Sequence, residues 1–599
     1  MVSNIFTKDF INAQAKNDAF MNKRRELWQP KNLADIFFTN GEKYKDKNAL
    51  NYKIGHRYEK LTYGELRDEI VKASLVLRDL GIKAGDYVLI VSENRPEWVI
   101  VDGALMSIGA ISVPIHKNLA PSQVECILNE TKPVLAFFSD NTALKTLGTG
   151  KKTIKYLVSF DQPSEARFLS FHNMMNKQKL NSDLIEQIKS ETLTIDIDTI
   201  MTVVYTSGTT GKPKGAQMTH HNFLSMILGN PITKMPDEDS KETSFSILPL
   251  SHVYERVAGN FLVLYTGSNI FYCLDINNFI NEIKACRPTI VVAVPRLYEK
   301  IYEQISAKLD KMALLKRAFN NLVAGKKQAK LTKLILNKLV FSKIRPSFGG
   351  RLRLCVSGGS AIDERIATMF RIAGIMFVSG YGLTETSATV SNSDPWSNKQ
   401  NTAGHIVKGL SVKVVNDEIV VKGPSVMKSY LNKKDTKDAF TEDGYFKTGD
   451  LGEVDADGYV KITGRKKDIQ VLTTGEKIVP TIIENAITLS QYIDQALLIG
   501  DGYKHVSAII VPNLEKISQA LKMNVDDLKN NEKSIRLLLD KEMEETTKDF
   551  PRVQQVRKYI IAKEPFSVKN DQMTTSLKLR RKNIIDAYSD DIKKVYKIQ

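Results

Sequence analysis

A run of glycine, hydroxyl and lysine residues at positions 205–215 reads YTSGTTGKPKG and directly follows an apolar segment, residues 200–204. The glycines let the backbone turn tightly and bring its N–H groups close to an anion. The hydroxyl groups and lysines add hydrogen-bond donors and positive charge. The run is not a Walker A loop, because only two residues separate Gly208 from the next glycine and proline follows Lys212. It predicts a loop that holds the phosphates of a nucleotide, formed by Thr206, Ser207, Gly208, Thr209, Thr210, Gly211, Lys212 and Lys214.

Three shorter clusters of small and polar residues also follow apolar, strand-like segments. The cluster SGYGLTETS at residues 379–387 places Glu385 among hydroxyl groups, where a carboxylate can hold Mg²⁺ beside phosphate oxygens. The cluster CVSGGS at residues 355–360 has glycines that allow a flat ring to lie on the backbone. The cluster YFKTGD at residues 445–450 ends in Asp450, which either takes the hydroxyls of a ribose or belongs to a plain Gly-Asp turn. Ligands of open α/β sheets bind beyond the carboxyl ends of strands, which is where the first of these clusters is expected.

The composition is that of an ordinary globular protein, with 42% hydrophobic and 26% charged residues in a chain of 599. That length is too great for one simple core and predicts two or more domains. The four cysteines lie far apart without a CxxC pair, which argues against a disulfide scaffold or a zinc site and favours the reducing cytoplasm. We expect neither a signal peptide nor a membrane-spanning helix, because the sequence lacks an apolar run of the required length.

Alternating strand-like and helix-like segments between about residues 61 and 390 predict an α/β fold with layered, largely parallel and buried strands. After residue 401 the pattern changes to short strands separated by glycine, which predicts a β-rich subdomain ending near Gly464. We therefore predict a large N-terminal domain over residues 1–463, a hinge over residues 464–469, and a small, mobile α+β domain over residues 470–599.

One segment, the basic insert of residues 306–346, carries much of the chain's net charge of +17. It has eleven basic residues and one acidic residue, and eleven minus one gives a net +10. Apolar residues recur at three- and four-residue spacing on both sides of Gly325, which predicts a pair of basic amphipathic helices. Such helices either lie on an anionic membrane surface or pack on their own domain with their lysines in water, and the sequence leaves both open. Nucleic acid is not an expected partner, because no recognised nucleic-acid module accompanies the charge.

The motifs YTSGTTGKPKG, YGLTETSA, TGD and GRKKD occur in the order and at roughly the spacing of the AMP-forming adenylating enzymes, which the chain resembles from about residue 61 to residue 583. Within that superfamily, LPLSHVYER at residues 248–256 and the basic insert resemble the long-chain fatty acyl-CoA synthetases. The stretch MTTSLKLRR at residues 573–581 resembles the one that carries the family's catalytic lysine, here Lys578. Proline usually stands at the position of Thr575, so the sequence departs from the family pattern close to Lys578. Two other basic residues, Arg580 and Lys582, lie near Lys578 in the sequence.

The resemblance implies ATP-dependent conversion of a long-chain fatty acid to acyl-CoA through an acyl-adenylate, with release of pyrophosphate and AMP. It implies ATP, Mg²⁺ and CoA as the small-molecule partners of the reaction, beside the fatty acid. The acid attacks the α-phosphate, and the thiol of CoA then takes the acyl group, which requires no cysteine of the chain.

The resemblance also implies a role for each matching residue. The loop over residues 206–214 would hold the β- and γ-phosphates, and Glu385 the metal. The catalytic set would be Lys578, Thr384, Glu385 and His252; the adenine would be framed by Ser357, Gly358, Gly359 and Tyr381, and the ribose held by Asp450 and Arg465. Lys578 would bridge the attacking carboxylate and the α-phosphate as a point charge. The resemblance favours a place for His252 beside the acyl carboxylate; the alternative is a polar residue that caps the end of a strand.

Members of the superfamily rotate the C-terminal domain between the two half-reactions. By analogy the pivot lies at Lys467 and Asp468, and the loop that meets the thiol donor is Gly475, Glu476 and Lys477. Two other functions remain open: an acyl-AMP ligase that loads a carrier protein, and a catalytically silent nucleotide-binding or membrane scaffold. A silent member is expected to have lost Lys578, Glu385 or the loop glycines, and all are present. We expect a cytoplasmic enzyme, with peripheral membrane contact through the basic insert as the open question.

Overall fold

The computed structural model describes residues 27–55, 57–163, 165–206, 213–234, 242–273, 278–309, 312–326, 328–396, 398–399, 402–529, 531–567, 569–573 and 579–597. The chain forms two compact units. Unit 1 holds residues 1–413, 420–447 and 454–461, and unit 2 holds residues 414–419, 448–453 and 462–599.

Unit 1 contains an eight-stranded sheet in the order β19-β9-β8-β4-β3-β5-β6-β7. Its strands are β3 (Tyr87–Val91), β4 (Ile111–Ile115), β5 (Leu135–Phe138), β6 (Tyr156–Ser159), β7 (Leu169–Ser170), β8 (Ile200–Thr206), β9 (Lys214–Thr219) and β19 (Ser429–Tyr430). The strands from β8 to β7 pair in parallel, whereas β9 pairs antiparallel with both β8 and β19. The central strands are continuous apolar runs because helices cover both of their faces.

A second, nine-stranded sheet of unit 1 runs in the order β16-β15-β14-β13-β12-β10-β11-β1-β2. Its strands are β1 (Asn48–Ile54), β2 (Arg57–Thr62), β10 (Thr243–Ser246), β11 (Asn269–Tyr272), β12 (Ile290–Ala293), β13 (Leu354–Ser357), β14 (Met376–Tyr381), β15 (Ser391–Asn392) and β16 (His405–Ile406). The strands from β1 through β11 to β14 pair in parallel, and β2, β15 and β16 add antiparallel edges.

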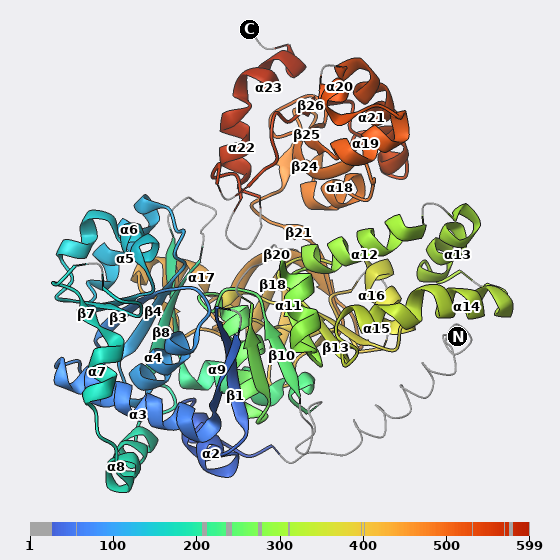
Figure 1. Cartoon of the computed structure of the whole chain (residues 1–599). Helices are drawn as coiled ribbons and strands as arrows, with labels where there is room; N and C mark the ends of the chain where they lie inside the picture. The colour runs from blue at the N-terminus through green and yellow to red at the C-terminus, as the bar shows by residue number, and fades with distance from the viewer. Residues whose placement is uncertain are drawn as a thin grey trace. The chain divides into compact units, whose positions relative to one another are not determined.

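Helices pack on the faces of both sheets, as Figure 1 shows. Those before the basic insert are α2 (Asp35–Lys43), α3 (Tyr63–Asp79), α4 (Pro96–Ser107), α5 (Pro121–Thr131), α6 (Asn141–Thr146), α7 (Phe171–Lys177), α8 (Ser182–Leu193), α9 (His220–Gly229), α10 (Leu262–Tyr265) and α11 (Phe279–Cys286). Short helical turns span Gly148–Lys152 and Pro231–Lys234, and a π-helical turn, Glu255–Phe261, precedes α10. The remaining helices of unit 1 are α12 (Pro295–Leu309), α13 (Ala313–Val323), α14 (Lys330–Leu336), the π-helical turn Asn337–Phe341, α15 (Ser342–Ser347), α16 (Glu364–Ile372) and α17 (Lys433–Ala439).

The basic insert forms helices that share a core with one face of the nine-stranded sheet. Phe319 of α13 stacks on Phe341, with ring centroids 5.9 Å apart. Leu336 and Ile344 are buried in the same core cluster as Tyr298 of α12. The predicted pair of helices around Gly325 is confirmed, and each of them buries one apolar face on unit 1.

Unit 2 has a three-stranded sheet in the order β24-β25-β26 and a two-stranded hairpin, β22-β23. Its strands are β24 (Ile493–Ile499), β25 (Ser507–Pro512), β26 (Lys558–Ile561), β22 (Gln470–Val471) and β23 (Lys477–Ile478). Its helices are α18 (Pro480–Ile487), α19 (Leu514–Leu521), α20 (Val525–Lys529), α21 (Glu532–Thr547), α22 (Arg581–Ala587) and α23 (Ser589–Tyr596). A four-stranded sheet, β17-β18-β20-β21, contributes residues to both units through β17 (Ser411–Val415), β18 (Glu418–Lys422), β20 (Phe446–Val454) and β21 (Val460–Arg465).

The predicted fold class is confirmed: a large α/β part with parallel sheets and a β-rich portion, followed by a smaller α+β part. The predicted hinge overlaps a strand, because β21 continues through Arg465. The predicted domain bounds at residues 463 and 470 stay predictions. Across the part of the chain that the structure describes, every helix is too short or too polar to cross a bilayer.

Candidate active site

The carboxyl ends of four neighbouring parallel strands of the nine-stranded sheet, β10, β12, β13 and β14, meet at one edge. The Cα partners are Ser246 with Val292, Ala293 with Ser357, and Ser357 with Ser379. The chain therefore leaves β10, β13 and β14 at the same edge, and there it enters the segments that contain His252, Ser357–Gly359 and Tyr381–Glu385. An open α/β sheet binds ligands at this edge. The structure thus brings these predicted site segments together within unit 1.

The predicted phosphate loop is held at both ends by the hairpin β8–β9. Thr206 and Lys214 are Cα partners in this antiparallel pair, so the loop leaves and rejoins the sheet at one point. The intervening site residues Ser207, Gly208, Thr209, Thr210, Gly211 and Lys212 lie outside the described residues. Strand β9 contacts the Thr384–Thr386 turn, which joins the base of the loop to the second predicted motif.

Glu385 lies in a buried cluster with a tyrosine and a lysine. The hydroxyl of Tyr430 donates a hydrogen bond to Glu385 Oε1 at 2.6 Å. Burial, with the carboxylate beside it, raises the pKa of the Tyr430 phenol, so it stays a donor at neutral pH. Lys214 Nζ lies 5.4 Å from the centre of the Tyr430 ring and 2.5 Å from Asp435 Oδ1. A carboxylate and a cation thus flank one aromatic side chain beside the base of the phosphate loop.

The turn that carries Glu385 is held in an unusual backbone conformation. Ser387 and Ala388 have positive φ values of 53° and 83°, which cost free energy for residues with a Cβ atom. The Ala388 carbonyl oxygen would lie only 2.1 Å from a Cβ atom at Gly382, so glycine is required there. The Met427 N–H donates to the Glu385 carbonyl at 2.7 Å, and the Ser387 hydroxyl donates to the Ser425 carbonyl at 2.8 Å. Strained backbone fixed by such contacts is typical of binding sites.

The predicted adenine segment passes close to the aromatic ring of Tyr254. A Cβ atom at Gly358 would lie 2.8 Å from the ring of Tyr254, so glycine lets the ring and the backbone approach closely. Tyr254 donates a hydrogen bond to the Val356 carbonyl at 3.2 Å. The Ser357 hydroxyl is buried and has no hydrogen-bond partner among the described residues. An orphaned buried donor beside a glycine-lined backbone fits a polar ligand edge.

His252 stands at the entrance of the π-helical turn Glu255–Phe261, which is anchored by a buried ion pair. His252 is half-buried, and its carbonyl accepts a hydrogen bond at 3.0 Å from the N–H of Arg256, the second residue of the turn. The Arg256 guanidinium is fully buried and binds Asp102 of α4 with two nitrogens, at 3.0 and 2.5 Å. It also donates to Thr202 of β8 at 2.7 Å and to Ser112 of β4 at 3.0 Å. Arg256 therefore attaches the His252 segment to the eight-stranded sheet.

Glu255, the residue beside this arginine, is completely buried. Burial raises the pKa of its carboxyl group to about 8, and the Ser246 hydroxyl and Leu248 backbone only partly offset that effect. A π-helical turn is rare and often marks a functional position.

Within unit 2 the structure brings Asp450 and Arg465 together. The Arg465 Nε donates to Asp450 Oδ1 at 2.7 Å, with Asp450 buried and Arg465 half-buried. Gly475 and Glu476 are the last two residues of the loop that joins β22 to β23, and Lys477 begins β23. Lys467 and Asp468 follow β21, and the Asp468 N–H donates to the Arg465 carbonyl at 3.0 Å. Lys578 lies outside the described residues.

The donor set at Glu385 fits Mg²⁺ held together with phosphate. Among the described residues, no group of three or more His, Cys, Asp or Glu side chains could hold a metal alone. Mg²⁺ is commonly held by one or two carboxylates together with substrate phosphates. One carboxylate beside hydroxyl groups and a phosphate loop matches that pattern better than a metal cage would.

Tyr430 and Asp435 belong to this cluster but were missed from the sequence. Both lie about fifty residues after Glu385, in a short strand and a helix whose residues show no motif of their own. Their only local signal is a Gly-Pro turn before β19, which does not reveal that β19 pairs with β9.

Open parallel sheets with glycine-rich and charged segments beyond their carboxyl ends define a class of nucleotide-binding α/β proteins. The comparisons with known proteins then assign the family. A model of the AMP-binding enzyme matches residues 37–431, and a model of the AMP-binding enzyme C-terminal domain matches residues 467–599. The chain belongs to the AMP-binding enzyme family.

Several individual proteins are similar over most of the chain. It is 29% identical over 588 residues to long-chain-fatty-acid–CoA ligase FadD15 of Mycobacterium bovis, covering 94% of this chain and 97% of the relative. It is 30% identical over 588 residues to long chain acyl-CoA synthetase 6, peroxisomal, of Arabidopsis thaliana, covering 90% and 82%. The adenylation domain of the carboxylate reductase from Mycobacterium chelonae superposes with a TM-score of 0.74 at 19% identity, over 98% of this chain and 94% of that one, which supports the fold alone.

Proposed function

We propose that this protein is an AMP-forming long-chain fatty acid–CoA ligase. The observation that carries the proposal is the cluster of Glu385, Tyr430 and Lys214 at the base of the phosphate loop. The relatives named as long-chain acyl-CoA synthetases or ligases support the substrate class, because they match nearly the full length of this chain.

The first half-reaction activates a poor electrophile. One carboxylate oxygen of the fatty acid attacks the α-phosphorus of ATP, an O–P bond forms, and the bond to pyrophosphate breaks. The product is an acyl-adenylate, a mixed anhydride whose acyl carbon reacts readily with a thiol. Negative charge accumulates on the phosphates during this step, so the protein must supply fixed positive charge and hydrogen-bond donors.

We assign the phosphates to the loop over residues 206–214 and to Thr384, which contacts the α-phosphate. Glu385 would hold Mg²⁺, with its carboxylate oriented by the hydrogen bond from the Tyr430 hydroxyl. Bound Mg²⁺ neutralises phosphate charge. Lys578 bridges the attacking carboxylate and the α-phosphate, and His252 lies beside the carboxylate.

We assign the adenine to Ser357–Gly359 and Tyr381, where the buried Ser357 hydroxyl is available as a polar partner. We assign the ribose hydroxyls to Asp450, whose carboxylate accepts a hydrogen bond from Arg465.

In the second half-reaction the CoA sulfur attacks the acyl carbon. A C–S bond forms, the C–O bond to AMP breaks, and the thiol proton is lost. Lys467 and Asp468 form the pivot that changes the position of unit 2 between the steps, and the turn Gly475–Glu476 with Lys477 meets CoA. The proposed domains are an N-terminal domain over residues 1–463 and a C-terminal domain over residues 470–599.

We also propose that the enzyme works in the cytoplasm with peripheral contact to an anionic membrane. Its long-chain substrate partitions into membranes, and the basic insert supplies a net +10 in one segment.

A product assay tests this function. Purified protein is incubated with ATP, Mg²⁺, CoA and straight-chain acids from acetate to oleate, and products are identified by mass spectrometry. The proposal expects AMP together with long acyl-CoA, and little acyl-CoA from acetate. Acyl-adenylate that accumulates despite CoA would favour a carrier-protein acceptor, and folded protein without turnover of any acid would favour a silent scaffold.

A further inference from the structure

The second helix of the basic insert is apolar on both of its faces. One face, with Leu336, Val340 and Phe341, packs into the core of unit 1. The opposite face, formed by α14 and the turn after it, leaves four large apolar side chains in solvent: Leu331, Leu334, Ile335 and Leu339. Leu331 is 67% exposed and Leu334 is 66% exposed. A cluster of exposed large apolar side chains on one helix face is typical of an interaction surface.

The neighbouring helix α13 adds to this surface. Its Leu314 is 87% exposed, and Met312 just before it is 44% exposed. Six of the large apolar side chains that are exposed on the described part of the chain thus fall between residues 312 and 339. We call the six the leucine face: Met312, Leu314, Leu331, Leu334, Ile335 and Leu339. Their clustering separates this patch from the single exposed apolar residues found on any protein.

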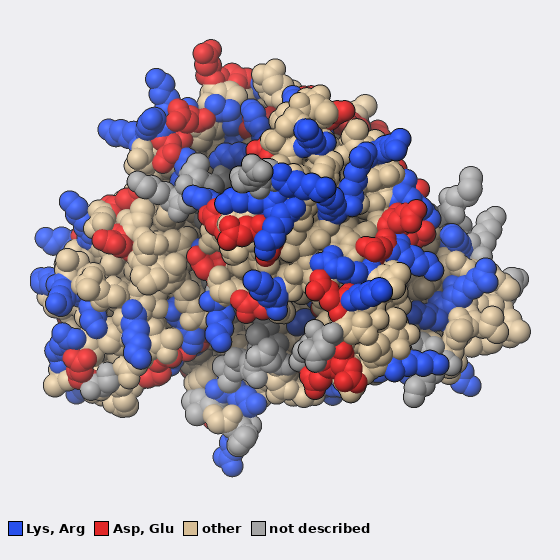
Figure 2. Space-filling model, turned by 90° about the horizontal axis from the view of Figure 1, so that it is seen from above, with Lys and Arg blue, Asp and Glu red and all other residues tan. Residues whose placement is uncertain are grey.

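Basic side chains border the leucine face. Arg317, Lys326, Lys338 and Lys343 are exposed, and Lys316 and Lys333 are half-buried. The sequence from residue 312 to residue 346 contains no acidic residue. In Figure 2, blue basic side chains adjoin uncharged tan surface at the right of the view, where α13 and α14 lie in Figure 1. A basic rim around an apolar centre complements a surface that is anionic outside and apolar beneath.

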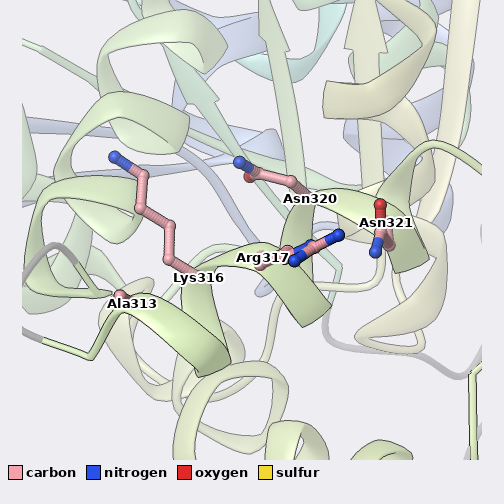
Figure 3. A pocket seen from close by; sticks show the side chains of 5 residues that line it. All are labelled: Ala313, Lys316, Arg317, Asn320 and Asn321. Atoms are coloured by element: carbon pink, nitrogen blue, oxygen red, sulfur yellow. The ribbon is translucent and has the colours of Figure 1, made fainter.

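Two open pockets of about 450 and 380 Å³ lie along α13 and share Arg317 and Asn321. The first is lined by Ala313, Lys316, Arg317, Asn320 and Asn321, which recur along one side of the helix in Figure 3. Two cations and two amides are suited to the oxygens of a phosphodiester. The second reaches α14 and has a more apolar lining, which includes Leu314, Leu315, Ala318 and Ile335.

We propose that α13 and α14 dock the enzyme on an anionic phospholipid bilayer, with Lys316 and Arg317 at a lipid phosphate and the leucine face in the acyl layer. The proposal rests on the proposed function, because a ligase that takes long-chain fatty acids has its substrate in a membrane. It differs from simple charge attraction, because part of the binding is apolar and is not screened by salt.

A second copy of this chain is a less suitable occupant. Two leucine faces brought together would also bring together two rims of like charge, with no acidic residue on the insert's outer helices to compensate. Single-stranded nucleic acid would need aromatic stacking platforms, whereas the exposed apolar side chains here are aliphatic.

Vesicle flotation tests the proposal with the full chain. The probes are vesicles of phosphatidylcholine alone and of phosphatidylcholine mixed with phosphatidylglycerol, at low and high salt. We expect wild-type protein to bind the mixed vesicles and to keep measurable binding at high salt, and to bind the neutral vesicles weakly. Binding to mixed vesicles that vanishes at high salt, or equal binding to both vesicle types, would overturn the combined mechanism.

Two double variants separate the contributions. Leu331→Ser with Leu334→Ser is expected to lower the partition coefficient about a hundredfold, since each leucine leaves an apolar environment. Lys316→Ala with Arg317→Ala is expected to lower it about thirtyfold at low salt and little at high salt. Matched controls lie in unit 2: Leu537→Ser removes a leucine that is also 67% exposed, and Lys593→Ala with Lys594→Ala removes an adjacent exposed pair. If the controls lower binding as much as the insert variants, the proposal is wrong.

Failure of docking and failure of the proposed ligase activity are distinguishable. All variants are assayed with oleate dispersed in detergent, where turnover should equal that of wild type because the substituted residues lie outside the candidate active site. A wild type that is active but does not bind mixed vesicles overturns only the docking proposal. Light scattering measures the oligomeric state. If wild type forms a dimer that Leu331→Ser with Leu334→Ser abolishes, and wild type does not bind vesicles, the leucine face binds a second copy of the chain instead.

Discussion

Tyr430, which lies between Glu385 and Lys214, is the main site residue that the structure adds to those found from the sequence motifs. Its hydroxyl orients one oxygen of the proposed metal-binding carboxylate, at 2.6 Å. Side chains that orient a metal ligand in this way are commonly worth ten- to a hundredfold in affinity or activity.

We predict that Tyr430→Phe raises KM for MgATP about tenfold. The ring and its contact with Lys214 remain, and only the hydrogen bond to Glu385 is lost. Steady-state kinetics over a range of Mg²⁺ concentrations would show a rightward shift of the Mg²⁺ dependence. Tyr559→Phe is the control, because it removes a similar tyrosine–carboxylate hydrogen bond, to Asp540 at 2.7 Å, in unit 2. An unchanged Mg²⁺ dependence in Tyr430→Phe would remove that tyrosine from the metal site.

Glu255 predicts a pH dependence of stability. Its folded-state pKa of about 8 lies above the usual 4.5, so the folded state holds a proton that the unfolded state releases between these values. Stability is therefore greatest at low pH with respect to this group and falls as pH rises toward 8, by roughly 4 kcal/mol in total. Glu255→Gln should remove this slope, making the variant about 3 kcal/mol more stable than wild type at pH 8 and nearly equal to it at pH 5.

Tryptophan fluorescence during denaturant unfolding is the measurement, because Trp28, Trp98 and Trp396 all lie in unit 1 with Glu255. Parallel pH profiles for wild type and Glu255→Gln would show that this carboxyl group is not the one that titrates.

At the scale of elements, the parallel strands were predictable and the hairpin before them was not. Apolar runs such as YVLIV at β3 are buried on both faces, so their composition alone identifies them. Strands β1 and β2, at residues 48–62, lie before the region that the motifs covered. β1 joins the sheet by pairing with β11, more than two hundred residues later, and such a partner has no local signal.

The basic insert shows that apolar spacing predicts helices but not their packing. The spacing of its apolar residues predicted two amphipathic helices, and both exist. Periodicity identifies an apolar face but not what covers it. The stripe of α13 that includes Phe319 and Leu322 is buried, whereas the stripe of α14 that includes Leu331 and Leu334 is exposed.

The π-helical turn depends on Arg256 for its attachment to the eight-stranded sheet. Arg256→Met would leave Asp102 buried without its cation, which costs about 3–5 kcal/mol. We expect that loss in unfolding monitored by tryptophan fluorescence, together with a higher KM for the fatty acid as the His252 segment loosens. The matched control Arg78→Met breaks a half-exposed ion pair with Glu191 and should cost less than about 1 kcal/mol. Equal losses in the two variants would contradict the anchoring role.

At the scale of the whole molecule, the chain forms two compact units, and the two family models match residues 37–431 and residues 467–599. The domain bounds that the sequence predicted, at residues 463 and 470, stay predictions. The pivot between the units stays a prediction, as does the role of Lys578.

We predict that Asp468→Pro spares adenylation and strongly impairs thioester formation. Proline fixes φ and removes the N–H that donates to the Arg465 carbonyl, so it stiffens the proposed pivot. Pyrophosphate release in the absence of CoA measures the first step, and acyl-CoA formation measures the second. Asp468→Ala, which keeps the N–H, is the control. Equal loss of both steps in the proline variant would refute the pivot assignment.

The most direct test of the whole account follows the oxygen atoms of the fatty acid. Oleate labelled with ¹⁸O in its carboxylate is converted with ATP, Mg²⁺ and CoA, and the products are weighed by mass spectrometry. If a carboxylate oxygen attacks the α-phosphorus and CoA then attacks the acyl carbon, one ¹⁸O must appear in AMP and none in pyrophosphate. Unlabelled AMP, or label in inorganic phosphate or pyrophosphate, would contradict the acyl-adenylate route.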